Sequence, residues 1–332
     1  MATRYLETGS QNPFYNLAFE EYVLRNRKNG DYLLLWQNHN TIVVGQNQIT
    51  DAEINRGFVE AHGIQVVRRS TGGGAVYHDL GNLNYSFITD AGDTDKLTME
   101  RFTAPIVHAL RQLGLNAEAS GRNDILVEGK KVSGTAQRLL GGRILHHGTL
   151  LFDSNPDMVS GALNADPEKF RSKGTKSVRS RIGNIRSFLK TDMELQAFWA
   201  HLKTTLAEEG VLTDTLTPEE LAAVRELEQT KYATWEWNFG RSPKYDFTNR
   251  RRFDGGTLEI GVQVEGGTIG EIGFYGDFLS RTSTEPVREA LRGCLFRREE
   301  VRQALAECSL DACFGDITRE EVLSVLFDGD IN

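Results

Sequence analysis

Three consecutive glycines at positions 72–74 impose the strongest local constraint in this sequence. They lie between an apolar strand candidate at 64–67 and a second one at 75–77, and Arg68 and Arg69 precede them. Without Cβ atoms, this backbone can take positive φ values and bring its N–H groups close to a ligand. Successive N–H groups in such a turn form a concave anion site, and arginine adds a permanent charge that suits carboxylate or phosphate. A glycine-rich hairpin turn with solvated arginines explains these residues equally well.

The length of 332 residues exceeds the size at which one core usually suffices, so it favours two domains. A polar segment at 240–252 that contains Pro243 is the predicted boundary. We therefore expect a large domain at 1–245 and a small one at 250–332. No apolar run approaches 18 residues, and the N-terminus has no signal-peptide pattern. These features predict a cytoplasmic protein that does not bind membranes, with a monomer as the default.

Strand and helix patterns occur in runs, without strict alternation of strand and helix. This order predicts an α+β fold, with a large domain of mixed or antiparallel sheets flanked by helices and a small α+β C-terminal domain. Expected helices lie at 13–27, 51–63, 98–113, 155–163, 192–209 and from 218, and later at 285–292, 297–306 and 318–327. Expected strands lie at 3–8, 32–37, 41–45, 64–67, 75–77, 83–89, 116–120, 124–127, 131–140, 143–152, 258–264 and 269–275. Asp51 is the expected N-cap of the helix at 51–63, and Thr217 begins a capping box.

The charge distribution limits the kinds of partner. The net charge of −8 argues against general nucleic-acid binding. One segment differs, because residues 169–190 hold eight basic side chains and no acidic one. Its glycines and serines favour a mobile basic loop over a helix. Such a loop could bind nucleic acid weakly, but the acidic C-terminal part at 249–332 would oppose this.

The cysteines and several absent motifs exclude familiar types of catalytic site. All three cysteines, Cys294, Cys308 and Cys313, lie near the C-terminus and are expected to be free thiols, so the first 293 residues contain no thiol nucleophile. The sequence contains no P-loop, no Rossmann fingerprint, no G-x-S-x-G elbow and no zinc-ligand spacing. The remaining chemical candidates are polar groups at strand ends.

Four polar segments carry these candidates. They are the arginine–glycine stretch, the charged turn at 121–124, the lysine-containing segment at 130–136 and the histidine pair at 146–149. Taken singly, each has a structural interpretation. Asp124 could cap a turn, Lys131 could be an exposed strand lysine, and His147 could be a satisfied buried histidine.

Taken together, the segments resemble a known family. The motifs R-R-S-T-G-G-G-A-V-Y-H-D-x-G-N, S-G-R-N-D, G-K-K-V-S-G-T-A, H-H-G-T-L and K-S-V-R-S-R are similar to those of the lipoate–protein ligases. The resemblance covers most of the chain, including W-E-W-N-F-G at 235–240. The G-C-L-F motif at 293–296 is similar to the accessory C-terminal domain of the long members. The glycine and lysine motifs belong to the wider lipoate/biotin ligase superfamily, and the later segments narrow the resemblance to the ligase.

The resemblance implies a reaction in two steps. ATP activates free lipoate to lipoyl-AMP with release of pyrophosphate, and a lysine of an acceptor lipoyl domain then takes the lipoyl group. Lys131 is the implied catalytic residue, which bridges the substrate carboxylate and the α-phosphate. Asp124 is the implied ligand of Mg²⁺. The implied acceptors are lipoyl domains of 2-oxoacid dehydrogenase E2 subunits and the glycine-cleavage H protein.

The family motifs also imply the binding residues. Those for ATP and the adenylate are Arg69, Gly74, Ala75, Val76, Tyr77, Asn82, Asp124, Lys131, Ser177, Val178 and Arg181. Those for lipoate are Trp36, Arg69, Gly73, Gly74, His78, Lys131, Ser133, Gly134, Ala136, His147 and Thr149. The segment around Ser177 resembles the adenylate-binding loop, whose closure would exclude water from the mixed anhydride.

Two related activities are weighed against the ligase. An octanoyltransferase would take its acyl group from a carrier protein without ATP, but the thioester route of such relatives needs a cysteine near the lysine. A biotin ligase would carry a G-R-G-R loop, which is missing here. The sequence does not rank lipoate against octanoate, because both are medium-chain acids with one carboxylate.

Overall fold

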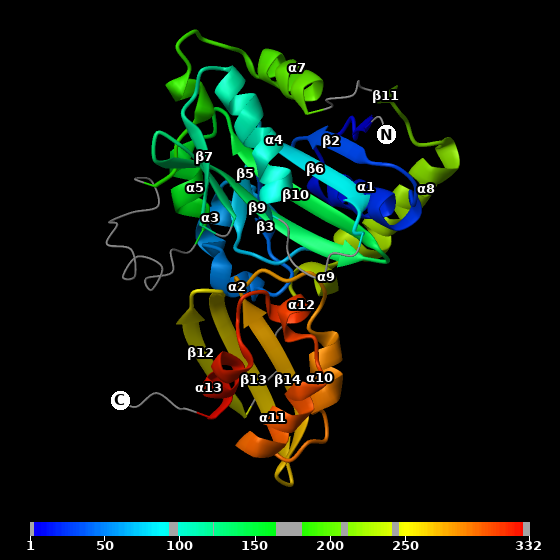
Figure 1. Ribbon diagram of the computed structural model, residues 1–332, viewed down its shortest axis with the longest axis vertical. Coiled ribbons are helices and arrows are strands. Elements are labelled where there is room, and N and C mark those ends of the chain that lie inside the picture. Colours follow the sequence, from blue (N-terminus) through cyan, green and yellow to red (C-terminus); the bar gives the residue numbers. More distant parts are fainter. Residues whose placement is uncertain are drawn as a thin grey trace.

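The computed structural model describes residues 3–92, 99–121, 123–163, 181–206, 212–240 and 246–327. A large N-terminal part and a smaller C-terminal module, residues 246–327, follow each other along the long axis (Figure 1). The large part is built on an eight-stranded sheet, and each part contains a three-stranded sheet as well. The predicted α+β class is confirmed.

The eight-stranded sheet is mixed. β2 pairs in parallel with β1, which also pairs in parallel with β11, whereas β2, β6, β10, β9, β8 and β7 form antiparallel pairs. In sheet order the strands are β11 (Leu212–Thr213), β1 (Arg4–Glu7), β2 (Tyr32–Trp36), β6 (Asn82–Asp90), β10 (Arg143–Leu151), β9 (Lys130–Leu140), β8 (Asp124–Val127) and β7 (Ala117–Ser120).

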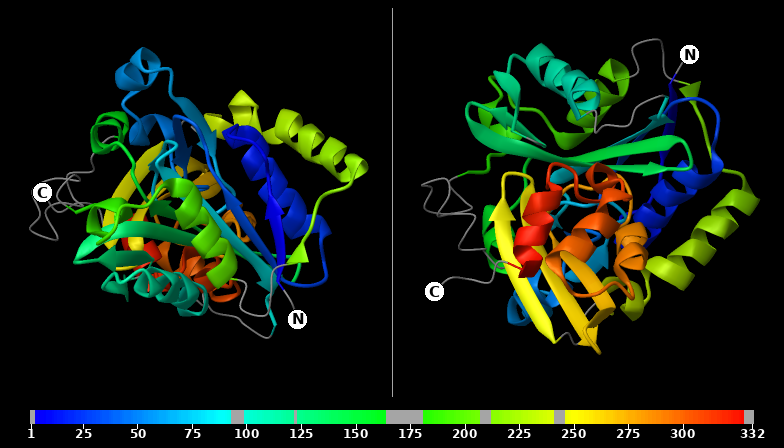
Figure 2. Two further views of the ribbon diagram at one scale, coloured as in Figure 1. Left: turned by 90° about the horizontal axis from the view of Figure 1, so that it is seen from above. Right: turned by 60° about the horizontal axis from the view of Figure 1, so that its bottom comes forward.

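Helices cover both faces of this sheet (Figure 2). Successive side chains of a strand point to opposite faces. Accordingly, Leu33 and Leu35 of β2 belong to the core formed with α4 (Met99–Gln112) and α7 (Leu195–Thr205). The intervening Leu34 belongs to the core on the other face. That face is covered by α1 (Pro13–Asn26), α8 (Pro218–Leu227) and η3 (Glu228–Tyr232).

A second, three-stranded sheet carries the glycine-rich segment. β3 (Thr41–Val44) lies in its centre, parallel to β4 (Gln65–Arg68) and antiparallel to β5 (Val76–His78). Short helices pack nearby: α2 (Thr50–Glu53), α3 (Arg56–Ala61), α5 (Pro156–Ala162) and α9 (Trp235–Asn238).

The prediction of one helix at 51–63 capped by Asp51 is wrong. Ile54 has an extended backbone between α2 and α3, and it forms a β-bridge with Leu163 that divides the helical segment. Asn55 is the N-cap of α3, because its side chain accepts a hydrogen bond from the N–H of Phe58. Asp51 lies inside α2. The capping box at Thr217 is confirmed.

The C-terminal module packs four helices against an antiparallel sheet. The strands are β12 (Phe247–Phe253), β13 (Gly256–Glu265) and β14 (Thr268–Gly276). The helices are α10 (Glu285–Leu291), α11 (Arg298–Ala306), α12 (Leu310–Phe314) and α13 (Arg319–Phe327), of which the sequence pattern missed α12. The module has a core of its own between Leu258 and Leu326, which supports the proposed division into 1–245 and 250–332. A 3₁₀ turn, η2 (Ile185–Phe188), completes the described elements, and none of the described helices is long and apolar enough to cross a membrane.

Candidate active site

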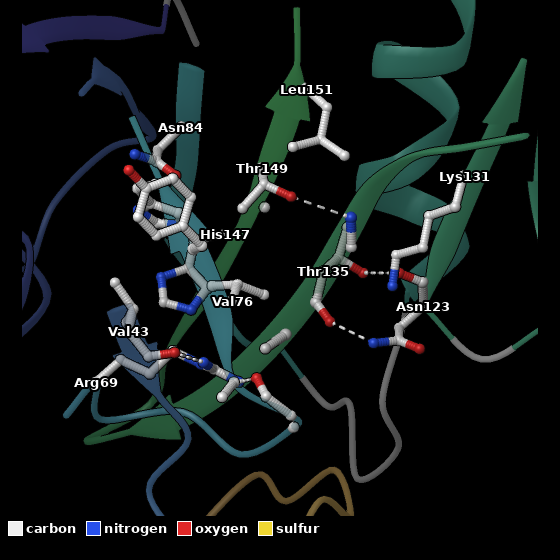
Figure 3. A pocket seen from close by; sticks show the side chains of 18 of the residues that line it. Val43, Arg69, Val76, Asn84, Asn123, Lys131, Thr135, His147, Thr149 and Leu151 are labelled. Atoms are coloured by element: carbon white, nitrogen blue, oxygen red, sulfur yellow. Dashed lines mark hydrogen bonds between the residues drawn. The ribbon is translucent and has the colours of Figure 1, made fainter. Parts of the chain in front are cut away.

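A cavity of about 360 Å³ lies between the two sheets of the large part (Figure 3). This volume falls within the range of roughly 300–1,000 Å³ that is common for small-molecule sites. Strands β5, β9 and β10 supply much of its wall, and two residues of the C-terminal module, Arg252 and Asp277, also line it. Figure 3 shows Lys131 on one side of the cavity and Arg69 with His147 on the other.

Lys131 and Asp124 form an ion pair at the edge of the cavity. Lys131 Nζ lies 2.7 Å from Asp124 Oδ1, and the two side chains are 34% and 25% exposed. Gly134 gives the lysine room, because a Cβ at this position would lie 3.0 Å from Nζ and 3.2 Å from Cε. Glycine therefore lets the ammonium lie against the strand, where it faces the cavity and solvent together.

Part of the basic segment is hydrogen-bonded to the backbone of this lysine. The N–H of Lys131 donates to the carbonyl of Arg181, and the N–H of Gly183 donates to the carbonyl of Lys131. Arg181 and Ile182 both line the cavity. Residues 181–183 of the basic segment are thus held beside Lys131, while Ser177 and Val178 lie outside the described residues.

Arg69 shapes the glycine-rich segment, which we call the glycine turn (residues 69–74). Its Nη2 donates to the carbonyls of Gly72 at 2.6 Å and Gly74 at 2.9 Å, and its Nη1 donates to the carbonyl of Val43 at 3.2 Å. Burial lowers the pKa of Arg69 to about 10, so the group stays charged at neutral pH. These bonds direct the guanidinium at the turn itself, although the side chain also lines the cavity. Its predicted contact with phosphate stays a prediction.

Arg68 points away from the cavity and is fully buried. Its guanidinium donates to the carbonyls of Gly45 and Gln48 and to the hydroxyl of Thr50. The backbone N–H of Arg68 donates to Oδ1 of Asn238 in the W-E-W-N motif. This arginine therefore connects three elements: its own strand β4, the helix α9, and the loop that follows β3. It supports the glycine turn on the side away from the cavity.

His78 and Asn84 place polar atoms without partners at the cavity wall. His78 Nδ1 lies 3.2 Å from the side-chain amide of Asn38, whereas His78 Nε2 and Asn84 Nδ2 have no hydrogen-bond partner among the described residues. Burial, with the nearby Arg69 charge as the next cause, lowers the pKa of His78 to about 3. His78 is therefore a neutral ring with a free nitrogen, suited to a polar group on a bound ligand.

His147 lies on the opposite side of the cavity from Lys131, with both ring nitrogens engaged. Nε2 lies 2.7 Å from Thr71 Oγ1, and Nδ1 lies 2.9 Å from Oε1 of Glu20. Glu20 belongs to helix α1, and its side chain is buried although it is a carboxylate, with 2% of the residue exposed. The sequence pattern identified His147 but neither of its partners.

The cavity brings most of the predicted site residues together. Those that line it are Trp36, Arg69, Gly73, Gly74, Ala75, Val76, Tyr77, His78, Asp124, Lys131, Gly134, Ala136, His147, Thr149 and Arg181. Asn82 and Ser133 are buried but are not among its lining residues; the Asn82 amide donates to Asn84 instead. Asn84 and Asn123 line the cavity but were not predicted as binding residues, although Asn123 belongs to the quoted S-G-R-N-D motif and Asn84 lies two residues after the glycine motif.

The C-terminal module touches the glycine turn directly. The N–H of Gly73 donates to the carbonyl of Phe278, and the side chain of Asn47 donates to Oγ of Ser280. Within the module, Nη1 of Arg252 lies 3.6 Å from Oδ2 of Asp277. In this arrangement the module closes one side of the cavity and uses one of the backbone donors expected to bind an anion.

The described residues contain no group of three or more His, Cys, Asp or Glu side chains arranged to hold a metal. Asp124 and Asn123 nevertheless place a carboxylate and an amide oxygen at the cavity wall. Mg²⁺ bound to phosphates needs only one or two carboxylates from the protein, so this pair fits a magnesium ion that arrives with a nucleotide.

Comparisons with known proteins cover both parts of the chain. The family model described as Lipoyl protein ligase A/B catalytic domain matches residues 12–207, and the model described as Bacterial lipoate protein ligase C-terminus matches residues 242–326. Lipoate–protein ligase 1 of Staphylococcus aureus is 44% identical over 95% of this chain and 97% of its own. Lipoate-protein ligase LplJ of Bacillus subtilis is 41% identical over 95% of this chain and 97% of its own.

Solved structures are similar to most of the chain. A lipoate-protein ligase A bound with ATP is 30% identical, with a TM-score of 0.63 over 72% of this chain and 99% of its own. A bi-partite lipoate protein ligase of Thermoplasma acidophilum, studied with its E2 lipoyl domain, is 32% identical, with a TM-score of 0.65 over 74% of this chain and 98% of its own. The putative ligase Ta0514 of T. acidophilum with bound lipoic acid is 29% identical, with a TM-score of 0.63 over 73% of this chain and 100% of its own. Because matches of this extent span both the motifs and the C-terminal module, the chain belongs to the lipoate–protein ligase family.

Proposed function

We propose that this protein activates free lipoate with ATP to lipoyl-AMP and transfers the lipoyl group to a specific lysine of acceptor lipoyl domains. The names of the S. aureus and B. subtilis relatives support lipoate as the substrate. The relatives bound with ATP and with lipoic acid support the two ligands.

The position of Lys131 carries the proposal. Activation brings a carboxylate up to the α-phosphate of ATP, so two negative groups must approach each other. An ammonium with space around it neutralises both, and Lys131 faces the cavity with only Asp124 as its ion-pair partner among the described residues. Lysine suits this role because its compact charge can contact two anions without the planar geometry of arginine. The ion pair with Asp124 keeps the side chain in place before ATP binds.

Strand β5 supports nucleotide binding at the cavity wall. β5 is an edge strand of its sheet, so its outward-facing backbone groups have no partner strand among the described residues and are available to the phosphates. Asp124, with Asn123, would hold Mg²⁺, which shields the phosphate charge and favours the departure of pyrophosphate. Arg181 adds a cation at the same wall, and Ser177 and Val178 belong to the proposed adenylate loop.

The opposite side of the cavity suits the acyl chain. Trp36, Val43 and Val76 provide apolar surface there. Gly73 and Ala136 also line the cavity, and their small size leaves room for the chain. We assign the lipoyl tail to this side, with its carboxylate directed at Lys131. Exclusion of water from the mixed anhydride would then require the adenylate loop and the C-terminal module.

The acceptors in this proposal are E2 lipoyl domains and the glycine-cleavage H protein. The T. acidophilum ligase described with its E2 lipoyl domain supports the first of these. The contact must be transient, because the modified domain has to leave after each turnover.

An octanoyltransferase that works without ATP is the second candidate. Its thioester route needs a thiol near the lysine, and no cysteine precedes Cys294 in the sequence. The three cysteines belong to the C-terminal module, and none of them lines the cavity. These positions favour the ligase.

The deciding experiment follows the intact mass of a purified apo-lipoyl domain. It is incubated with this protein, lipoate, Mg²⁺ and ATP, and in parallel with octanoyl-carrier protein without ATP. A gain of one lipoyl group that depends on ATP supports the ligase. A gain from the carrier protein alone supports the transferase, and no gain in either reaction overturns both.

A further inference from the structure

A chain of buried hydrogen bonds runs behind the cavity wall from the glycine turn to helix α1. Thr71 Oγ1 lies 3.0 Å from Nε of Arg69 and 2.7 Å from Nε2 of His147. Nδ1 of the same imidazole lies 2.9 Å from Oε1 and 3.1 Å from Oε2 of Glu20. All four side chains are buried, so water does not compete for these bonds.

A second branch reaches the same carboxylate from strand β2. The indole N–H of Trp36 donates to Ser86 Oγ at 2.9 Å, and the Ser86 hydroxyl donates to Glu20 Oε1 at 2.5 Å. Trp36 and His147 both line the cavity, whereas Glu20 does not. One carboxylate on α1 therefore connects two parts of the cavity wall, on β2 and β10 of the same sheet, with the glycine turn.

With a neutral imidazole between these end groups, one direction for each bond satisfies every group. Arginine and tryptophan can only donate, and an ionised carboxylate can only accept. Thr71 Oγ1 therefore accepts from Arg69 and gives its own proton to His147 Nε2. The imidazole then carries its proton on Nδ1 and donates it to Glu20. For a neutral ring, reversing the bond to Thr71 would place an unprotonated Nδ1 against the acceptor oxygens of Glu20.

The network also balances charge across the buried wall. The Glu20 carboxylate is the one group that raises the pKa of Arg69 against the lowering effect of burial. Arg69 and Glu20 thus compensate each other through the intervening threonine and histidine. Because Arg69 also holds the carbonyls of Gly72 and Gly74, the relay ends in the backbone of the turn.

We propose that Glu20 is a positioning residue, which acts through His147 and Thr71 to hold the glycine turn in its ligand-binding shape before the acid substrate arrives. The inference rests on the proposed function, because it takes the acyl substrate to lie against Trp36, His147 and the turn. Glu20 itself contacts neither substrate nor nucleotide in this proposal. Its effect is to make the turn and the two walls behave as one rigid unit.

A double-mutant cycle between Glu20 and Thr71 tests the relay, since these two residues do not contact each other. Thr71→Val removes the hydroxyl at nearly constant shape, Glu20→Gln removes the charge, and lipoate affinity is measured by calorimetry. Loss of one hydrogen bond to a charged network lowers affinity about tenfold, so each single variant should weaken binding by about that factor. In a connected relay, the double variant should also be about tenfold weaker. Independent effects would multiply to about a hundredfold, and that result would overturn the proposal.

The matched control is Thr71→Ser, which keeps the hydroxyl and loses only a methyl group. It should stay within about threefold of the parent affinity, since the relay bond remains. Equal loss in the serine and valine variants would show that packing, not the hydroxyl, matters. If Glu20→Gln does not fold, the serine and valine pair still decides the question.

The imidazole tautomer gives a readout that does not depend on lipoate binding. Nitrogen-15 spectra of the parent protein should show His147 protonated on Nδ1, with its signals assigned by their absence in a His147→Asn variant. Glu20→Gln should move the proton toward Nε2. An Nε2-protonated ring in the parent protein would contradict the relay, whereas a parent protein with this tautomer and no affinity for lipoate would instead contradict the proposed function.

Discussion

At the scale of single residues, Lys131 makes the sharpest prediction. Lys131→Ala removes the ammonium that neutralises the carboxylate and the α-phosphate during activation. Loss of a comparable preorganised donor lowers a rate by about 10²–10³. Pyrophosphate release in the presence of lipoate and ATP should fall by this factor, while lipoate affinity in calorimetry should change far less.

Lys130→Ala is the control for this variant. Lys130 precedes Lys131 on β9, is exposed and does not line the cavity. It should release pyrophosphate at the parent rate. An equal loss of pyrophosphate release in both variants, or a parent rate in Lys131→Ala, would show that Lys131 has no specific role in activation.

Two buried histidines predict an acid-sensitive fold. Burial lowers the pKa of His78 and of His146 to about 3, against an ordinary value of 6.5. Below pH 6.5 the unfolded chain binds protons that the folded chain does not, so stability falls as the pH decreases. Between pH 7 and 5, each histidine should lower the free energy of unfolding by about 2 kcal/mol. Urea denaturation at several pH values measures this slope, and His146→Asn should remove about half of it; an unchanged slope would mean that His146 is protonated in the fold.

At the scale of elements, the glycine turn depends on a close approach to the end of β3. A Cβ on Gly45 would lie 2.0 Å from the carbonyl oxygen of Gly73, a backbone atom that cannot move without the turn. Gly45→Ala should therefore destabilise the protein by about 1–3 kcal/mol and weaken lipoate binding at least about tenfold. Urea denaturation and calorimetry measure the two effects. The control is Gly57→Ala in α3, whose nearest contact would be 3.9 Å away and which should not weaken either property.

The same elements show which parts of this molecule a sequence can predict. The long strands β9 and β10 follow from alternation around a Gly-Gly turn, and their motifs placed Lys131 and His147 in one cavity. The burial of Glu20 could not be foreseen, because its reason is a histidine 127 residues away in the chain. The division of α2 from α3 has the same origin, since it depends on the bridge from Ile54 to Leu163. Local patterns predicted the elements, whereas contacts between distant segments decided where charges lie.

At the scale of the whole molecule, the contact between the glycine turn and the C-terminal module links the two parts. The N–H of Gly73 donates to the carbonyl of Phe278, and the N–H of Gly276 donates to the carbonyl of Asn47. The first bond uses a backbone donor of Gly73, a residue of the turn that lines the cavity. A ligand that needs this donor would therefore compete with the module for it.

Gly72 tests this contact, because it has no room for a side chain. A Cβ there would lie 2.7 Å from the carbonyl oxygen of Phe278 and 3.0 Å from the N–H nitrogen of Ser280, both backbone atoms of the module. Gly72→Ala should push the module away from the turn and speed amide exchange at Gly73 and Gly276. Gly266→Ala strains the β13–β14 turn, because Gly266 has a φ of +57°, but its Cβ would meet nothing within 4 Å, so both amides should stay protected. Parent-like protection in Gly72→Ala would mean that the module adjusts without separating. Faster exchange at these two amides alone would identify the turn as the place where the two parts come apart, because the core of the module would remain closed.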